Sequence, residues 1–392
     1  MDFKLTEEQL MIRQTFRDFA QKEVKPLSRI LDAKPDPKDC IDWNLVKKAS
    51  DLGVNVLALP EEWGGTNADI ITRLIVQEEL AAADVGFADL MRDHGRFFTH
   101  MSKEQRDEFL PQYLADYTFF TAGAHTEPDH GTDDIMGHAD PAASIQTYAE
   151  KRGDEYILNG TKHFISHAGI AKLYGIWART DKKLPIHQCN YGFLVPANTP
   201  GLKIGKFMNK MGRRLLINAE IILEDVHVPI EHKIPPKSNM DGWTQGNESV
   251  NQGVLLICAN IIGLCRCAYE ETLNYARTRI QGAKPIIQHQ NIAVKLAEMK
   301  VKIEACRSLV WQHAWCMENN YNFDIQMWKL IKGFVNKMSV DIIHNAVDIH
   351  GGLGIDRDLP IEKYLRDVYS TLHGMGMPDI SLIRGAPTLT TD

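Results

Sequence analysis

The chain has 392 residues, enough for two or three domains or one large layered architecture. Its 44 Lys and Arg residues against 51 Asp and Glu residues give a net charge of −7, which leaves no broad basic field for nucleic acid or anionic lipid. Hydrophobic residues make up 44% of the chain, which suffices for an ordinary core and argues against disorder.

The N-terminal stretch and the cysteines predict a cytoplasmic protein. The sequence MDFKLTEEQLMIRQTFRDFAQKEV carries charges throughout and has no apolar signal-peptide region. The longest apolar run, GVLLICANIIGLC, is interrupted by Asn260 and is too short for a bilayer, so we expect no membrane span. The seven cysteines form no CxxC pair and no metal-ligand spacing, which predicts buried, reduced thiols and no metal site.

Residues 1–118 are predicted to form an N-terminal α-helical domain. Apolar residues recur at near-helical spacing along the first segment, where Thr6 with Gln9 resembles a capping box. Helical patterns return at 43–54 and 68–84, with a loop between them.

Residues 119–237 are predicted to form a compact central β domain. Segment 144–168 is typical of a strand, a turn at Gly153–Asp154, a second strand, a break at Asn159–Gly160 and a third strand. Four more strands are expected at 172–180, 191–197, 202–207 and 219–229.

Residues 238–392 are predicted to form a C-terminal α-helical bundle. Three long helical segments cover 261–280, 289–319 and 324–351, and the apolar residues of each favour one face. The order is therefore helical, β, helical, an α+β multidomain class.

Several motifs follow one another along this frame. FTAGAHTEPDHGTDD supplies a loop rich in backbone and hydroxyl donors, which alone is a weak sign of a phosphate- or flavin-contacting turn. NGTKHFISHAG places Phe164 and Ser166 on alternate positions of a strand, so both face one side. The remaining motifs are GLKIGKFMNKMGRRLLINAEIILEDVHVP, YARTRIQGAKPIIQHQ, VDIHGGLGIDRDLPIEKYLRD and the turn LHGMGMPDIS.

This set, in this order and over nearly the whole length, resembles the acyl-CoA dehydrogenase family. That family carries a TEPxxGSD-type loop, a WITN-type strand, an MGxR…FxDVxVP segment, an ALxRxxFG…HQ stretch and a QxxGGxG…RD segment. The resemblance implies a helical N-terminal domain, a central β-barrel domain and a C-terminal four-helix bundle. It also implies FAD bound between subunits of a homotetramer, an acyl-CoA substrate and an electron-transfer flavoprotein as acceptor.

The resemblance implies a cofactor site position by position. Phe164 stands where the family usually has Trp, which keeps the aromatic ring and loses the indole donor. Asp348 replaces the usual Gln, and Arg279 matches the arginine that reaches the neighbouring subunit's FAD. The implied cofactor positions are His125, Thr126, Gly131, Thr132, Phe164, Ser166, Arg279, Gln281, Gln290, Asp348, Gly351, Gly352, Met377 and Asp379.

Substrate positions follow in the same way. Arg92, Asn251 and Gly376 are the implied substrate-binding residues, and Val254 falls where a CoA-contacting Arg is common. In the family, the turn here called LHGMGMPDIS reads YEGTSQIQ, and its Glu removes the α-proton while a hydride leaves the β-carbon for flavin N5. An ungapped count from Arg366-Asp367 places Met375 at the Glu position; one gap would place His373 there.

The loss of the usual base directs attention to another carboxylate. In an α,β-unsaturated thioester the γ-carbon is acidified through the double bond, so a base displaced from the α-carbon suits such a substrate. Asp93, on a predicted stripe with Gly86, Leu90 and Phe97, is the candidate base, and burial would raise its pKa toward usefulness. The alternative is that Asp93 and Arg92 form an ion pair at a helix end.

A subgroup of the family that oxidises cyclohex-1-ene-1-carboxyl-CoA to the cyclic 1,5-diene thioester, in anaerobic degradation of alicyclic and aromatic compounds, fits this pattern. In it an Asp on the pocket helix replaces the Glu. The expected catalytic pair is then Asp93 as base and the backbone N–H of Met375 for the thioester carbonyl. The alternatives are acyl-CoA desulfination with Arg92 as the cation, flavin monooxygenation, and a non-catalytic CoA- or FAD-binding protein.

Overall fold

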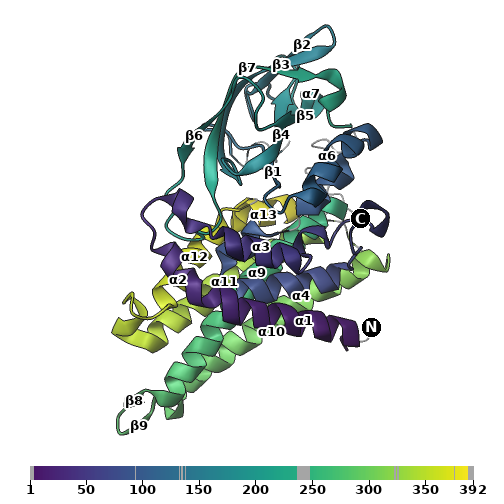
Figure 1. The fold of residues 1–392 in the computed structure, drawn as a ribbon. Helices are drawn as coiled ribbons and strands as arrows, with labels where there is room; N and C mark the ends of the chain where they lie inside the picture. Colours follow the sequence, from purple (N-terminus) through teal and green to yellow (C-terminus); the bar gives the residue numbers. More distant parts are fainter. Residues whose placement is uncertain are drawn as a thin grey trace.

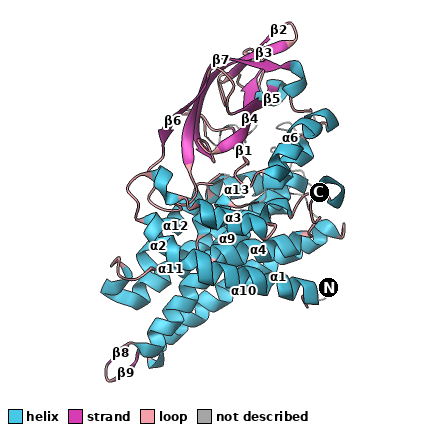
Figure 2. Ribbon diagram, in the orientation of Figure 1, coloured by secondary structure: helices cyan, strands magenta, loops and turns pink. Residues whose placement is uncertain are grey.

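The computed structural model describes residues 4–92, 94–131, 133, 136, 138–235, 248–321, 324, 326–374 and 376–386. The strands of the large sheet gather at one end of the molecule, and the long helices fill the other end (Figure 1). Figure 2 shows the same division by secondary structure, with a two-stranded hairpin at the far tip of the helical part. The expected helical, β, helical order is confirmed.

The N-terminal helices begin at a capping box, as predicted. Thr6 Oγ1 accepts from Gln9 N at 3.1 Å, and Gln9 Oε1 accepts from Thr6 N at 3.2 Å. Helix α1 continues through a π-helical turn at Ala20–Val24 into α2. The helices of this part are α1 (Glu7–Phe19), α2 (Lys25–Asp32), α3 (Trp43–Asp51), α4 (Ile70–Ala81), α5 (Val85–Leu90) and α6 (Lys103–Ala115), with a 3-10 helix at His94–His100.

The central domain is a seven-stranded sheet with the order β1-β4-β2-β3-β7-β6, in which β5 also pairs with β4. Strand β1 runs parallel to β4, whereas β3 and β7 form a long antiparallel pair. The strands are β1 (Phe120–Ala124), β2 (Tyr148–Arg152), β3 (Glu155–Ser166), β4 (Ala171–Arg179), β5 (Asn190–Pro196), β6 (Leu202–Phe207) and β7 (Asn218–Pro229), with a short helix α7 (Ile186–Cys189) before β5.

The predicted break at Asn159–Gly160 is wrong, because β3 runs through it. The pairing with β7 shifts register between Leu158 and Gly160, so the glycine forms a bulge within one strand. Gly160 has φ +151°, and a Cβ there would lie 2.5 Å from Thr147 Oγ1. The glycine therefore serves close packing in a strand and not a hairpin turn.

The C-terminal part is a bundle around α9, which packs against α4, α10 and α11. Buried apolar side chains of these helices form one continuous core with those of the β domain. The elements are α9 (Glu248–Thr278), β8 (Ile280–Gln281), β9 (Lys284–Pro285), α10 (Gln290–Glu318), α11 (Met327–His350), a 3-10 helix at Gly351–Gly354, α12 (Ile361–Leu372) and α13 (Pro378–Gly385).

Helix α9 is longer than its apolar run suggested. Over Val250–Thr278 it is long and apolar enough to cross a membrane by length and composition, which corrects the expectation that the run is too short. However, 89% of its most apolar window is buried inside the structure, and core helices of soluble proteins meet the same criterion. Its apolar surface is thus already covered by the bundle.

Ion pairs join the buried helix α4 to its neighbours. Glu79 pairs with Arg17 of α1 at 2.9 Å and with Arg266 of α9 at 2.7 Å. Glu78 pairs with Arg307 of α10 at 2.9 Å. Each buried carboxylate is thereby compensated, which a buried charge requires.

Candidate active site

The loop after β1 is held in place by Glu127. Its carboxylate accepts from Gln146 N at 2.7 Å, from Thr147 N at 2.8 Å and from the buried Lys162 Nζ at 2.8 Å. Burial acts to raise the pKa of Glu127, but Lys162 and these hydrogen bonds outweigh it and hold the pKa below its usual range. The loop is therefore preorganised around an ionised carboxylate.

The predicted cofactor residues His125 and Thr126 lie in this loop. The His125 ring stacks on Trp177 at 4.0 Å between centroids, and burial lowers its pKa to about 3, so the imidazole is neutral. Thr126 O accepts from His163 N of β3 at 2.8 Å, which ties the loop to the strand. Gly131 leaves open space where a Cβ would stand, and Thr132 lies outside the described residues.

Strand β3 carries Phe164 and Ser166 near its end, where the regular alternation assumed from the sequence is interrupted. Phe164 is 53% exposed, Ile165 is buried, and Ser166 is half-buried. The pairing with β7 is irregular here, and Phe164 has φ +56°. Asn218 holds this irregular backbone, because its Nδ2 donates to Phe164 O at 2.9 Å and to Ser166 Oγ at 3.1 Å. An exposed aromatic ring beside a hydroxyl is a surface suited to an isoalloxazine ring.

The predicted pocket stripe is wrong, because helix α5 ends at Leu90. Met91 caps the helix, and the chain re-enters a 3-10 helix only at His94. A single helical period therefore does not carry Gly86, Leu90 and Phe97 on one face. Asp93 itself lies outside the described residues.

Asp89, four residues earlier in the sequence, is the centre of a buried polar cluster. Its carboxylate accepts from Arg92 Nη1 at 2.9 Å, from Asn260 Nδ2 at 3.0 Å and from Arg213 Nη2. These partners come from the N-terminal part, from α9 and from the loop between β6 and β7. Arg92, a predicted substrate residue, is thus paired with Asp89.

The turn between α12 and α13 carries the motif LHGMGMPDIS. Exposed His373 ends α12, and Gly376 has φ +91°, a conformation that favours glycine. The buried Lys332 of α11 donates to Gly376 O, and burial lowers the pKa of Lys332 to about 8. Met375 lies outside the described residues.

Helix α13 starts directly after this turn and carries two predicted cofactor residues. Met377 is the N-cap residue and is 45% exposed. Asp379 pairs with Lys337 at 3.1 Å on the surface. Both therefore lie at an accessible edge of the turn.

The loop before β7 packs closely against α12 and is hydrogen-bonded to it. A Cβ at Gly212 would lie 2.3 Å from Arg366 O, so only glycine fits there. Arg213 N donates to Asp367 Oδ1 at 2.6 Å, and Arg213 Nη1 donates to Ser370 O at 3.2 Å. The β domain is thereby fixed to the helix that leads into the turn.

The remaining predicted cofactor residues lie at the opposite end of the molecule. Arg279, Gln281 and Gln290 are exposed beside the β8–β9 hairpin, far from the sheet (Figure 1). Gly351 and Gly352 have open space where a Cβ would stand. Asp348 pairs with Lys295 at 2.7 Å, which lowers its pKa. One chain thus does not bring this group together with Phe164 and Ser166.

Asn251 is not available to a substrate. Its side chain is fully buried in α9, and its Oδ1 lies 3.3 Å from His313 Nε2 of α10. A side chain enclosed in the bundle cannot contact CoA in this conformation, so the predicted role is wrong. Val254, three residues further along the helix, is equally buried.

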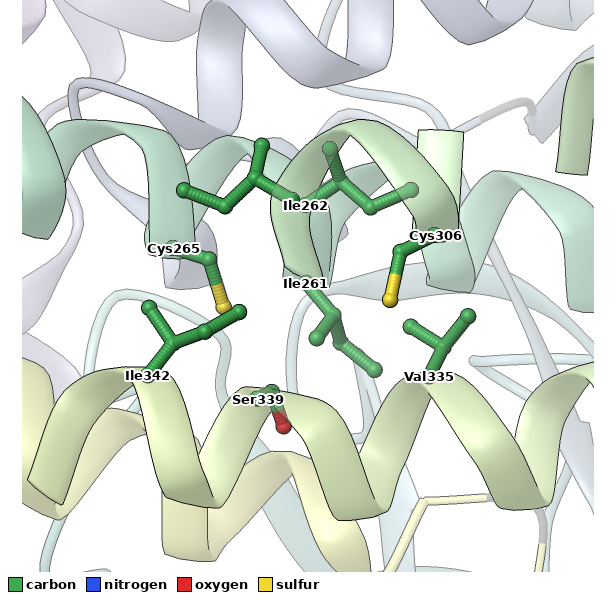
Figure 3. Close-up of a pocket in the computed structure, with 8 residues that line it drawn as sticks. Ile261, Ile262, Cys265, Cys306, Val335, Ser339 and Ile342 are labelled. Atoms are coloured by element: carbon green, nitrogen blue, oxygen red, sulfur yellow. The ribbon is translucent and has the colours of Figure 1, made fainter. Parts of the chain in front are cut away.

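A narrow packing gap between α9, α10 and α11 lies within the bundle core and has no room for a water molecule (Figure 3). Its walls are apolar apart from Ser339 and the thiols of Cys265 and Cys306. Burial raises the pKa of Cys306 to about 12, so that thiol is neutral. All seven cysteines are free, and the described residues contain no group of His, Cys, Asp or Glu that could hold a metal ion.

Sequence reasoning missed Lys332, Asp89 with Arg213, and Lys210 with Asn218. Lys332 had one available signal, a cation within the apolar run WKLIKGFV of a core helix. The other two pairs join residues on different elements, and no local pattern marks such partners.

Comparison with known proteins bears on this whole arrangement. Models of the acyl-CoA dehydrogenase N-terminal, middle and C-terminal domains match residues 6–116, 122–226 and 240–386. An acyl-CoA dehydrogenase of Bacillus subtilis (strain 168) is 31% identical over 372 residues, covering 94% of each chain.

Solved structures are similar in fold over the whole length of this chain. Butyryl-CoA dehydrogenase from Megasphaera elsdenii has a TM-score of 0.89 at 28% identity over 100% of both chains. A chain from the structure of the electron transferring flavoprotein of Acidaminococcus fermentans has a TM-score of 0.88 at 30% identity over 100% of both. The FAD complex of PigA has a TM-score of 0.87 at 25% identity, covering 100% of this chain and 99% of the other.

The residues present fit FAD. The exposed Phe164 ring beside Ser166, the braced loop and the open glycines at 131, 351 and 352 leave room for a flat ring system and for close approach of a phosphate-bearing chain. The chain belongs to the acyl-CoA dehydrogenase family and is an FAD-dependent oxidoreductase.

Proposed function

We propose that this enzyme oxidises an alicyclic enoyl-CoA, cyclohex-1-ene-1-carboxyl-CoA, to the cyclic 1,5-diene thioester by 1,4-elimination. The proposal is supported by the sequence of the turn: an ungapped count from Arg366-Asp367 places Met375 at the family's Glu position, and the stretch from His373 to Met377 contains no carboxylate. A methionine cannot accept the proton that the family's reaction removes.

The proposed reaction places the base at the γ-carbon. Asp93 removes the γ-proton, the ring double bond shifts, and the hydride leaves the other ring carbon attached to the α-carbon. Bound FAD supplies the hydride acceptor. The backbone N–H of Met375 holds the thioester carbonyl, and the Lys332 bond to Gly376 O supports the backbone that presents it.

Asp89 lies four residues before Asp93 in the sequence and is the other carboxylate of this segment. Its hydrogen bonds argue against a role as the base. Both Asp89 oxygens already accept hydrogen bonds, from Arg92 and Asn260 on one and from Arg213 on the other. A base needs a free lone pair directed at the carbon that it deprotonates. Asp89 therefore has a structural role, and Asp93 is the residue we assign as the base.

The pairing of Arg92 also bears on desulfination. That chemistry would use Arg92 as a free cation for a sulfinate, but its Nη1 lies 2.9 Å from Asp89 Oδ1. The same pairing means that Arg92 can contribute to substrate binding only through its remaining donors. Flavin monooxygenation and non-catalytic binding are distinguished by the experiment below.

We further propose a cytoplasmic homotetramer with FAD bound between subunits, and with domains at 1–118, 119–237 and 238–392. The β8–β9 hairpin, which begins one residue after Arg279, lies far from β3, the strand that carries Phe164, and this supports a site completed by a second copy (Figure 1). The similarity to a chain solved in the electron transferring flavoprotein structure supports such a flavoprotein as electron acceptor.

Deuterium exchange tests the position of proton removal. The FAD-loaded enzyme would be incubated anaerobically in D₂O with cyclohex-1-ene-1-carboxyl-CoA and, separately, with cyclohexanecarboxyl-CoA. We expect deuterium at the γ-carbon of the unsaturated thioester, absent in Asp93→Asn and retained in the surface control Asp181→Asn. Exchange at the α-carbon of the saturated thioester, or no exchange with either compound, would contradict the proposal.

A further inference from the structure

Lys210 contacts Asn218 at the start of β7, and Asn218 pairs with Ser166 at the end of β3. Lys210 follows β6, and its Nζ donates to Leu216 O and to Asn218 Oδ1. Burial and the neighbouring Arg213 lower the pKa of Lys210 to about 7. The ammonium and the neutral amine both keep two N–H donors, so both forms can hold the two acceptors.

These contacts fix the orientation of the Asn218 amide from both ends. The Lys210 ammonium can only donate, so the atom facing it is Oδ1. Phe164 O only accepts, so the atom 2.9 Å from it must be Nδ2. The chemistry of the neighbouring groups therefore determines which amide atom is oxygen and which is nitrogen.

The orientation of Asn218 in turn decides the role of Ser166. Asn218 Nδ2 lies 3.1 Å from Ser166 Oγ and donates to it. The Ser166 hydroxyl is therefore an acceptor on that side, and its own hydrogen points elsewhere. No hydrogen bond donated by Ser166 Oγ occurs among the described residues, Ser166 is half-buried, and Phe164 two residues before it is 53% exposed.

We propose that Lys210 and Asn218 are positioning residues that make Ser166 an obligatory hydrogen-bond donor to the flavin. The proposal deepens the assigned FAD site and rests on the placement of the flavin against Phe164 and Ser166. A hydrogen bond donated to the flavin stabilises the electron density gained on reduction, so it raises the reduction potential. Neither residue touches the flavin; both act through Ser166.

The test measures the reduction potential and visible absorption spectrum of the FAD-loaded protein, without substrate. Ser166→Ala sets the scale of the effect. We expect Lys210→Met to lower the potential by most of the Ser166→Ala shift, and Lys210→Arg, which keeps the donors, to restore it. Asn218→Asp, which removes the N–H while keeping the shape, is expected to act in the same direction.

A double-mutant cycle separates the relay from a simple loss of charge. If Lys210 acts through Ser166, Lys210→Met adds no further shift in the Ser166→Ala background. Lys203→Met, on exposed Lys203 of β6 in the same domain, is the charge control and should leave the potential unchanged. Additive shifts for Lys210 and Ser166 would overturn the relay.

Failure at the site level is distinguishable from failure of the relay. An unchanged potential and spectrum in Ser166→Ala would show that the flavin does not meet this strand, and would overturn the proposal together with the site assignment. Because no substrate is added, neither result depends on which acyl group the enzyme oxidises. If Lys210→Met does not fold, Asn218→Asp carries the same cycle.

Discussion

At the scale of single residues, buried charges decide how the site is held. Glu127 is 6% exposed and Lys162 is fully buried. Lys162 and two backbone N–H groups donate to the Glu127 carboxylate, so the charge is satisfied beneath the loop after β1. Breaking one partner of such a pair leaves an uncompensated charge in a medium that solvates it poorly.

Glu127→Gln should therefore be costly. It leaves Lys162 without its counter-charge, and we expect a loss of about 3 kcal/mol in the free energy of unfolding. Urea titration monitored by circular dichroism measures the loss. The control is Glu150→Gln, which removes an exposed pair with Arg152 and should cost well under about 1 kcal/mol. Equal costs for the two variants would mean that Glu127 is no better enclosed than a surface carboxylate.

Residues also show where sequence reasoning reaches its limit. Phe164 and Ser166 were placed on one side of a strand by simple alternation. β3 is a strand there, but its pairing with β7 shifts register between Lys162 and Ile165, so alternation alone does not establish a shared side. Lys210 lies eight residues before its partner Asn218 and Lys332 lies 44 before Gly376, each pair bridging different elements. Such partners are set by the packing of the whole chain, so no local pattern predicts them.

At the scale of elements, the change from helical to strand periodicity and back placed the three regions, because period follows directly from backbone geometry. The wrong predictions concern positions where tertiary packing overrides the local sequence signal. Asn159-Gly160 is a strong turn signal, but both flanks of β3 pair with β7 and the glycine packs on Thr147. The pocket helix was extended past Leu90 because nothing in the sequence marks its end.

The contact between the β6–β7 loop and α12 is the element-scale feature most open to a test. Gly212→Ala would place a methyl group 2.3 Å from Arg366 O, so the loop or the helix must shift. We expect a loss of about 1–3 kcal/mol in unfolding free energy and weaker FAD retention on gel filtration. Gly123→Ala in β1, where the nearest atom to the added Cβ lies at 3.7 Å, serves as the control. A stable, fully loaded Gly212→Ala protein would show that this contact does not couple the domains.

At the scale of the whole molecule, the proposed cofactor residues fall into two groups that one chain does not bring together. We expect Arg279→Ala to weaken FAD binding roughly thirty-fold, the loss of one charge-assisted hydrogen bond of about 2 kcal/mol. Arg277→Ala, exposed two residues earlier, should bind FAD normally. Fluorescence titration of the apoenzyme gives both affinities.

Mixed oligomers then show whether the halves come from different subunits. Co-expressed Arg279→Ala and Phe164→Ala chains should regain a class of tight FAD sites, because some sites combine the intact half of each. Mixed oligomers without tight sites would place the whole cofactor site within one chain.

The most direct test of the central claim is anaerobic bleaching of the oxidised-flavin absorption band. Wild type and Asp93→Asn, both FAD-loaded, would each be mixed with cyclohex-1-ene-1-carboxyl-CoA and with a straight-chain saturated acyl-CoA. The displaced-base account predicts bleaching of the wild type by the cyclic enoyl thioester and no bleaching of Asp93→Asn. Bleaching that survives in Asp93→Asn would move the base to His373 or water, and no bleaching by either compound would contradict the dehydrogenase account of this site.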